Sequence, residues 1–155
     1  METILGFMSA NHAELDSIFD EFKKQQRNDI DKAKRLFHNF KVGLQKHIVW
    51  EEEILFPIFE EKAGMRGNGP TAVMRMEHLQ IKKFLDEIHT KLLEKELEGI
   101  DRLESDLFEL LHAHNQKEEN ILYPAIDNLL TNAETEKAFN KMANISPDQY
   151  EKCCQ

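Results

Sequence analysis

The stretch His47-Ile-Val-Trp-Glu-Glu-Glu-Ile-Leu-Phe-Pro-Ile58 recurs, with few changes, as His114-Asn-Gln-Lys-Glu-Glu-Asn-Ile-Leu-Tyr-Pro-Ala125. Both copies follow the pattern His-x3-Glu-Glu-x-Ile-Leu-aromatic-Pro. Four residues of α-helix advance the chain by about 400°, so the histidine and the first glutamate lie about 40° apart on one face and about 6 Å apart along the axis. An imidazole and a carboxylate at this spacing suit a first-row metal such as iron, manganese or zinc. The repeat therefore predicts two helices that carry metal ligands.

The repeat extends towards the N-terminal side of each copy. A single histidine, His12 or His78, precedes each His-x3-Glu motif by nearly the same interval. A methionine stands four residues before each of these histidines, at Met8 and Met74. Each copy thus contributes two histidines and one glutamate. Two equal half-sites predict a site for two metal ions.

Apolar residues recur with the 3.6-residue period of amphipathic helices, and we find no convincing alternation typical of a strand. Four long helices with short links predict an all-α, antiparallel up-down four-helix bundle, the usual host for a metal site between facing helices. We expect the bundle over residues 1–132, with pseudo-repeats 1–63 and 70–132 joined by a glycine-rich connector. A short C-terminal helical extension is expected over 133–155. The first, third and fourth helices are expected at roughly 3–26, 71–97 and 101–130. Asn28-Asp29 offers a turn and an N-cap for the second helix, and Pro57 bends or ends its regular part before a loop that begins at Gly64.

Length and charge limit the classes of function. The chain of 155 residues is long enough for one domain with a substantial core. A net charge of −9 argues against binding to nucleic acid or to an anionic membrane surface. No apolar run approaches the roughly 20 residues of a membrane span, and the first residues lack the basic region of a secretory signal. Cys153 and Cys154 are adjacent and form no disulfide framework, so a cytoplasmic protein is expected.

The matched positions of the repeat decide which residues are predicted as ligands. A lone histidine on an apolar stripe is more often a core or surface residue than a ligand, but here the pattern occurs on four helices. Buried glutamates would be unfavourable unless they were paired or bound to a metal. The predicted ligands are His12, His47, Glu51, His78, His114 and Glu118.

Other polar residues near these motifs are expected to have other roles. His38 and His112 fall on the opposite helix faces from the predicted ligands, and His89 lies roughly 16 Å along the axis from His78, too far for the same site. Glu52 and Glu119 lie about 100° around the helix from the predicted ligands before them. We expect these two carboxylates to face solvent or to pair with lysines.

The single histidines and the doubled His-x3-Glu motif, over roughly residues 1–130, resemble the hemerythrin-like, or HHE cation-binding, proteins. This resemblance implies a non-haem di-iron centre within a four-helix bundle, completed by an oxo or hydroxo bridge. It also implies that Glu51 and Glu118 bridge the two irons. His12 and His47 would then serve one iron, and His78 and His114 the other.

Two differences separate this chain from the oxygen-carrying hemerythrins that it resembles. Those proteins have a His-x3-His pair on the third helix, where this chain has Met74, and a His-x4-Asp on the fourth helix. Fewer protein ligands leave more open coordination positions. Methionine is a poor ligand for ferric iron and suits the lining of a pocket. We expect an apolar pocket that admits a diatomic molecule, lined by Met8, Met74, Leu15, Ile48, Trp50, Ile81 and Ile121.

Three functions remain open from the sequence. The first is binding of dioxygen, or of nitric oxide, for storage, delivery or sensing. The second is a di-iron redox enzyme or iron donor in nitric oxide stress, oxidative stress or iron–sulfur cluster repair. The third is a structural or metal-storing bundle that holds zinc or manganese. No separate catalytic dyad, nucleophile or cofactor loop is visible, so we rank ligand binding first.

Overall fold

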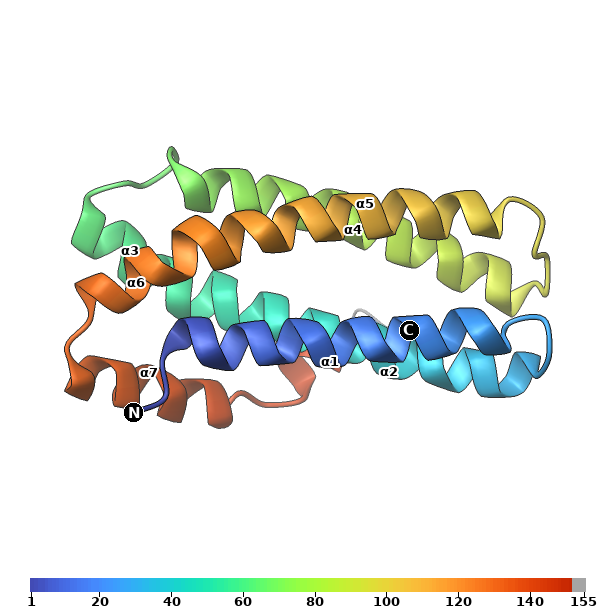
Figure 1. The fold of residues 1–155 in the computed structure, drawn as a ribbon, viewed down its shortest axis with the longest axis horizontal. Helices are drawn as coiled ribbons and strands as arrows, with labels where there is room; N and C mark the ends of the chain where they lie inside the picture. Colours follow the sequence, from blue (N-terminus) through green and yellow to red (C-terminus); the bar gives the residue numbers. More distant parts are fainter. Residues whose placement is uncertain (152–155) are drawn as a thin grey trace.

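The computed structural model describes residues 1–151 of the chain, so Cys153 and Cys154 lie outside the described residues. Figure 1 shows two antiparallel helix pairs packed against each other, one formed by α1 and α2 and the other by α4 and α5. No strand occurs among residues 1–151, which confirms the predicted all-α bundle. The four long helices are α1 (Ile4–Gln25), α2 (Ile30–Trp50), α4 (Pro70–Leu93) and α5 (Ile100–Lys117).

Two of the long helices continue through a π-helical turn into a further α-helix. The π-helical turns are η1 (Glu51–Leu55) and η2 (Glu118–Leu122). They lead into α3 (Phe56–Ala63) and α6 (Tyr123–Leu129), each of which has a proline near its start. Proline has no N–H to donate to the preceding turn, and its ring displaces the carbonyl four residues earlier, so the helix widens before it. The prolines thus alter the helix without ending it.

Polar side chains fix the helix ends. Asp29, the expected cap of α2, accepts a hydrogen bond from the backbone N–H of Lys32 at 3.1 Å. Asp127 of α6 accepts the backbone N–H groups of Ile4 and Leu5, at 2.8 and 3.1 Å. A carboxylate at a helix N-terminus satisfies otherwise unpaired donors and interacts favourably with the helix dipole. This contact joins the end of the second repeat to the start of the first.

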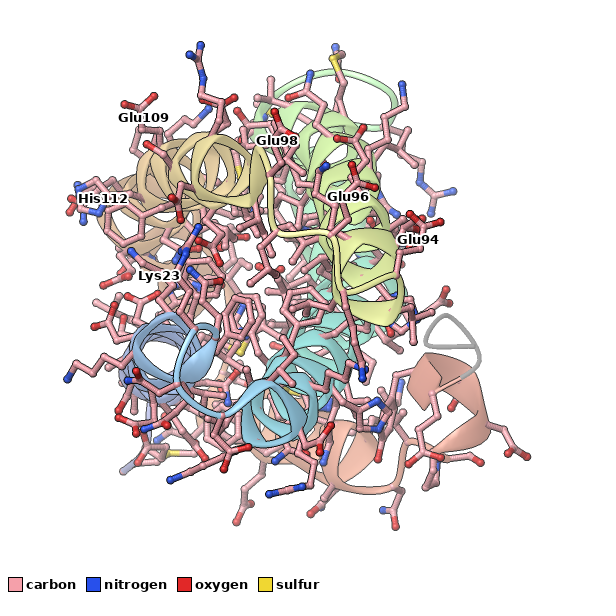
Figure 2. The ribbon with its side chains drawn as sticks, turned by 90° about the vertical axis from the view of Figure 1, so that its right-hand side faces the viewer. Lys23, Glu94, Glu96, Glu98, Glu109 and His112 are labelled. Atoms are coloured by element: carbon pink, nitrogen blue, oxygen red, sulfur yellow. The ribbon has the colours of Figure 1, made fainter. Side chains whose placement is uncertain are left out.

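The link between α4 and α5 begins earlier than the sequence suggests. Helix α4 ends at Leu93, whereas the pattern predicts a helix to about residue 97. Lys95 and Gly99 take positive φ values of 54° and 77°, which α-helices exclude. Figure 2 looks onto this end of the bundle and shows Glu94, Glu96 and Glu98 on its outer surface, where all three are exposed.

The interior consists of two apolar clusters, one towards each end of the bundle. The cluster nearer the α1–α2 and α4–α5 links is rich in phenylalanine and leucine and includes Phe37, Phe40 and Leu85. The other cluster includes Phe56 and Leu122. Burying apolar side chains stabilises the fold by roughly 1.5–3 kcal/mol for each large residue. The buried polar residues predicted as ligands fall between the two clusters along the helix sequences.

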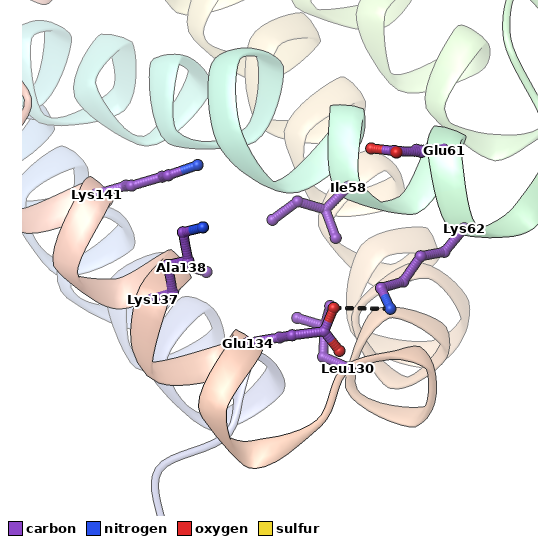
Figure 3. A pocket seen from close by; sticks show the side chains of 8 residues that line it. All are labelled: Ile58, Glu61, Lys62, Leu130, Glu134, Lys137, Ala138 and Lys141. Atoms are coloured by element: carbon purple, nitrogen blue, oxygen red, sulfur yellow. Dashed lines mark ion pairs between the residues drawn. The ribbon is translucent and has the colours of Figure 1, made fainter.

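The C-terminal segment folds back along the first repeat. Helix α7 (Asn132–Ala143) begins with a capping box formed by Thr131 and Glu134. Figure 3 shows α7 facing α3 across a surface pocket, with Glu134 paired to Lys62 at 2.8 Å. Trp50 donates its indole N–H to the Met142 carbonyl at 3.1 Å. The short α8 (Asp148–Glu151) follows and packs on α2. No helix within residues 1–151 combines the length and apolar character needed to cross a membrane.

Candidate metal centre

All six predicted ligands converge in the interior between the four long helices. None of these residues is more than 4% exposed, although all are ionisable. Their imidazole nitrogens and carboxylate oxygens form two groups, and within each group the atoms lie within 4.8 Å of one another. One group contains Glu51, His78, His114 and Glu118, and the other contains His12, His47 and Glu118. The structure therefore brings the two halves of the repeat to a single site.

A π-helical turn begins at the glutamate in each copy of the repeat. In the first copy, Phe56 donates its backbone N–H to the Glu51 carbonyl, five residues earlier. In the second copy, Tyr123 makes the same bond to the Glu118 carbonyl. π-Helical turns inside α-helices are rare and often occur at functional sites. The extra residue in each turn allows the glutamate and the aromatic residue five positions later to face the interior together.

The two oxygens of Glu118 face different half-sites, whereas a single oxygen of Glu51 lies near histidines of both. Oε1 of Glu118 lies 3.2 Å from Nε2 of His12, whereas its Oε2 lies 3.2 Å from Nε2 of His114. Oε1 of Glu51 lies 3.2 Å from Nε2 of His78 and 3.6 Å from Nε2 of His47. A carboxylate with one oxygen towards each neighbour can connect two cations. This geometry suits the bridging role that the resemblance implies.

Each histidine of the site holds a polar partner at Nδ1 and turns Nε2 inward. The partner of His12 is Glu119, at 2.8 Å, and the partner of His78 is Glu52, at 2.6 Å. An outer partner at one ring nitrogen fixes the orientation and tautomer of a metal-binding imidazole. The expectation that these two glutamates face solvent or pair with lysines is therefore wrong. The π-helical turn widens the helix at this point, so the residue after the inward glutamate reaches the histidine of a neighbouring helix.

The other two histidines show the same arrangement with different partners. Nδ1 of His47 lies 2.7 Å from Oδ1 of Asn11, and Nδ1 of His114 lies 2.9 Å from Oε1 of Glu77. Asn11 and Glu77 each precede the single histidine of their repeat. The neutral amide in one half and the carboxylate in the other are the first sign that the half-sites differ.

Tyr123 also belongs to the site, although the sequence pattern did not identify it. Its hydroxyl oxygen lies 2.8 Å from Oε2 of Glu51 and 3.0 Å from Oε1 of Glu118, and it donates its single hydrogen to one of them. Burial and the two carboxylates raise the pKa of Tyr123 well above that of an exposed tyrosine. The Phe/Tyr difference between the two copies is the only sequence signal that could have indicated this residue, and it reads as ordinary aromatic packing.

The predicted pocket residues fall on both sides of the site. Met8, Met74 and Trp50 belong to the apolar cluster near α3 and α6, and three others (Leu15, Ile48 and Ile81) belong to the cluster at the opposite end. Ile121 is 61% exposed, so its assignment to the pocket is wrong. The π-helical turn at η2 changes the phase of the helix, so that Leu122 points inward and Ile121 outward.

The remaining histidines lie outside the site. His38 and His112 are exposed, as predicted, and Figure 2 shows His112 on the surface of α5. His89 is half-buried, and its pKa is lowered by burial and by the nearby charge of Lys41. None of these three belongs to either ligand group.

Burial and mutual repulsion set the protonation of the two central carboxylates. Burial raises the pKa of Glu51, and the neighbouring charge of Glu118 raises it further. Burial also opposes ionisation of Glu118, but hydrogen bonds from Glu51, His114 and His12 outweigh it and lower the pKa of Glu118 below its usual range. Glu118 in turn raises the pKa values of His12 and His114, against the effect of burial.

Burial and hydrogen bonds shift the pKa values of His78 and His47 in opposite directions. Burial works against protonation of His78, but hydrogen bonds with Glu51 and Glu52 outweigh it and raise its pKa to about 9. Burial lowers the pKa of His47 to about 3, so this imidazole is neutral and its lone pair is available. Protons on the histidines thus offset the negative charge of the buried carboxylates. A metal cation that displaced those protons would offset the same charge.

The donor set fits metal ions of the first transition row. Imidazole nitrogens and carboxylate oxygens are the ligands that iron, manganese and zinc accept. Three buried atoms of the site, Oε1 of Glu51, Nε2 of His78 and Oε2 of Glu118, have no well-formed hydrogen bond within residues 1–151. Buried polar atoms are rarely left unpaired, and a bound cation would satisfy these three. These three atoms all point to the half-site that also contains His114.

Comparison with known proteins agrees with this geometry. The family model described as the hemerythrin HHE cation-binding domain matches residues 3–126. A solved hemerythrin HHE cation-binding domain-containing protein from Mycobacterium kansasii shares the fold, with a TM-score of 0.76 and 21% identity, covering 98% of this chain and 89% of that one.

Two curated relatives are similar over part of their length. The iron–sulfur cluster repair protein YtfE of Edwardsiella ictaluri is 34% identical over an alignment of 95 positions, which covers 52% of this chain and 40% of that protein. A DNA nickase of Nostoc sp. is 29% identical over 127 residues, which are 82% of this chain and 34% of that protein. The chain therefore spans less than half the length of both relatives. Since the family model covers most of the chain, including all six predicted ligand residues, the chain belongs to the hemerythrin HHE cation-binding domain family.

Proposed function

We propose that this chain holds a non-haem di-iron centre and binds a small diatomic ligand there, dioxygen or nitric oxide, for storage, delivery or sensing. The observation that carries this proposal is the pair of carboxylates, Glu51 and Glu118, whose oxygens face both half-sites. Four histidines complete the set, two in each half. Two bound irons would supply the coordination positions for the ligand.

The surroundings of the site support a small ligand. The six ligand residues are at most 4% exposed and lie between two apolar clusters. Met8 and Met74 flank the site on α1 and α4, one helical turn before His12 and His78. A buried, apolar surrounding excludes large and charged substrates and suits an uncharged diatomic molecule.

The experiment that tests this proposal combines metal analysis with optical spectroscopy. Protein reconstituted anaerobically with ferrous iron is expected to bind two irons per chain. On exposure to air, a stable new visible band would support ligand binding, and rapid oxidation without such a band would indicate redox chemistry. An iron content near zero, with two zinc or manganese ions bound instead, would contradict the di-iron proposal.

A second candidate function is redox chemistry or iron donation in iron–sulfur cluster repair. Similarity to the cluster repair protein YtfE, which is 34% identical over 95 aligned positions, favours it. Transfer of iron from the reconstituted protein to an apo-ferredoxin, measured by the return of the cluster's absorbance, would separate this candidate from ligand binding.

Metal loading is expected to stabilise the fold strongly. The unloaded site confines carboxylates and imidazoles in an apolar interior, where a cation relieves their mutual repulsion. At a free metal concentration of about 1,000 times the dissociation constant, binding adds about 4 kcal/mol to the free energy of unfolding. For a chain of this size, that corresponds to a melting temperature higher by roughly 8–16 °C. Equal melting temperatures of chelated and loaded protein would contradict this coupling.

Replacing Met74 with histidine is expected to increase metal retention and to slow the decay of any visible band that forms in air. The new side chain would stand four residues before His78, on the same face of α4, and would fill an open coordination position. Dialysis against a chelator and the decay rate of the band measure the two effects. Met74→Leu keeps the packing without adding a ligand and serves as the control. Unchanged retention and decay in Met74→His would show that residue 74 only packs.

A further inference from the structure

The hydroxyl oxygen of Tyr123 lies among the ligand atoms of one half-site. It is 3.2 Å from Nε2 of His47 and 3.4 Å from Nε2 of His12. It is also 2.8 Å from Oε2 of Glu51 and 3.0 Å from Oε1 of Glu118. The Tyr123 side chain is fully buried. One phenol oxygen thus contacts all three residues of the group that would hold the first metal, and Glu51 as well.

These distances are those that separate neighbouring ligands on one metal ion. In an octahedral site with bonds of about 2.0–2.2 Å, neighbouring donor atoms would lie about 3.0 Å apart. The two Nε2 atoms of His12 and His47 lie 3.1 Å apart, and Nε2 of His12 lies 3.2 Å from Oε1 of Glu118. The Tyr123 oxygen has the same spacing from its neighbours. It therefore fits as a fifth donor of this half-site.

Within residues 1–151, the other half-site has no equivalent donor. In the repeat, Phe56 occupies the position of Tyr123, and its ring stacks on His78 with centroids 5.8 Å apart and planes 10° from parallel. Phe56 is fully buried, so the difference between the two copies is one hydroxyl group inside the site. The first half-site gains an oxygen donor, and the second keeps an apolar ring beside its histidines.

We propose that Tyr123 is a ligand of the metal held by His12 and His47, and that the two metals are consequently inequivalent. Binding forms a bond between the phenol oxygen and that metal, and the phenol proton leaves to water. The metal held by His78 and His114 keeps fewer protein ligands, so the diatomic ligand binds there, beside Phe56. This inference rests on the proposed di-iron function.

The composition of the chain makes the proposal directly testable. The chain contains only two tyrosines, Tyr123 and Tyr150. A phenolate bound to ferric iron gives a visible charge-transfer band and enhanced ring vibrations in resonance Raman spectra. We expect both signals in the wild-type protein loaded with two ferric ions, and we expect the vibrations to shift when the protein is grown on ring-deuterated tyrosine. This measurement needs no variant.

Variants assign the signal to one residue. Tyr123→Phe should lose at least 90% of the phenolate band, whereas Tyr150→Phe should keep it. The double variant Tyr123→Phe with Phe56→Tyr moves the hydroxyl to the other copy of the repeat and should restore the band. Mössbauer spectra should show two doublets of equal area in the wild type, with a smaller difference between them in Tyr123→Phe.

The outcomes separate this inference from the proposed function. Wild-type protein with two irons per chain but no phenolate signal would overturn the role of Tyr123 and leave the di-iron function intact. An unchanged band in Tyr123→Phe would do the same. Failure of the wild-type protein to bind iron would overturn both.

Discussion

Replacing Glu118 with glutamine is expected to empty both half-sites. Glu118 is the one residue that belongs to both ligand groups, and its two oxygens lie 3.2 Å from histidines of opposite halves. An amide is neutral and offers one acceptor oxygen, so it cannot bridge two cations. The affinity for each metal should fall by more than about 100-fold, beyond the 10–100-fold typical of outer partners. Metal content after gel filtration, and titration calorimetry, measure the loss.

Two glutamates provide matched comparisons for this variant. Glu104 is 2% exposed and lies in a different part of the interior, where the side-chain amide of Gln26 donates to it at 3.1 Å. Glu104→Gln should keep two metals per chain. Glu119→Gln removes only the outer partner of His12 and should give an intermediate loss of about 10–100-fold. Retention of both metals by Glu118→Gln would show that Glu118 does not connect the half-sites.

Most of the ligand geometry could be predicted because the repeat constrains it. Helical spacing alone places each histidine and its glutamate on one face, and the duplication requires the faces to meet. The structure brings together all six residues so selected, and it shows the expected Asp29 cap and the antiparallel bundle. These features depend on helix periodicity and local capping, and both can be recognised in the amino-acid sequence.

Several features of the site that the sequence did not reveal depend on the π-helical turns. A helix with a constant rise and rotation places Ile121 inward and Glu52 and Glu119 towards solvent. The extra residue in η1 and η2 changes the phase, which exposes Ile121 and brings both glutamates to histidines of other helices. Tyr123 reaches the ligands for the same reason. The apolar periodicity gives no sign that the helix widens locally. The proline that ends the motif in both copies is the feature consistent with such a widening.

The pseudo-symmetry of the chain is also broken outside the site, by its C-terminal helices. Ile54 and Ile121 occupy equivalent positions in the repeat, yet Ile54 is 8% exposed and Ile121 is 61% exposed. Helix α7 contacts η1, which contains Ile54. Long-range packing of this kind depends on where a distant segment folds back, and no local pattern specifies it.

Raising the pH from 6.5 to 9 is expected to lower the free energy of unfolding of the metal-free protein, which is prepared with a chelator. The same change in pH should increase the affinity for metal. The pKa of His78 is raised to about 9 in the folded chain, from an ordinary value of 6.5. The proton on His78 therefore stabilises the fold fully below pH 6.5, and this stabilisation is lost as the pH rises through 9. A pKa shift of this size contributes about 3 kcal/mol to the free energy of unfolding. The raised pKa values of His12 and His114 act in the same direction.

His47 has the opposite effect on the acid side. Because its pKa is lowered to about 3, the neutral imidazole stabilises the fold above pH 6.5, and this contribution is lost as the pH falls towards 3. The chelated protein should therefore be most stable near pH 6.5. Urea unfolding of chelated protein at a series of pH values from 4 to 9 measures both limbs.

Above pH 6.5, the affinity for metal should rise with pH while the stability of the metal-free protein falls. A cation at His78 must displace the proton that Glu51 and Glu52 hold on this imidazole, so protons compete with the metal up to a pH of about 9. The affinity should rise about tenfold per pH unit for each proton displaced. Glu52→Gln removes a carboxylate 2.6 Å from Nδ1 of His78 and should lower the pKa of that histidine. The pH range over which protons compete with the metal should then move to lower values. An affinity independent of pH between 6.5 and 8.5 would show that no proton leaves these histidines on loading, and the metal would then have to bind elsewhere in the chain.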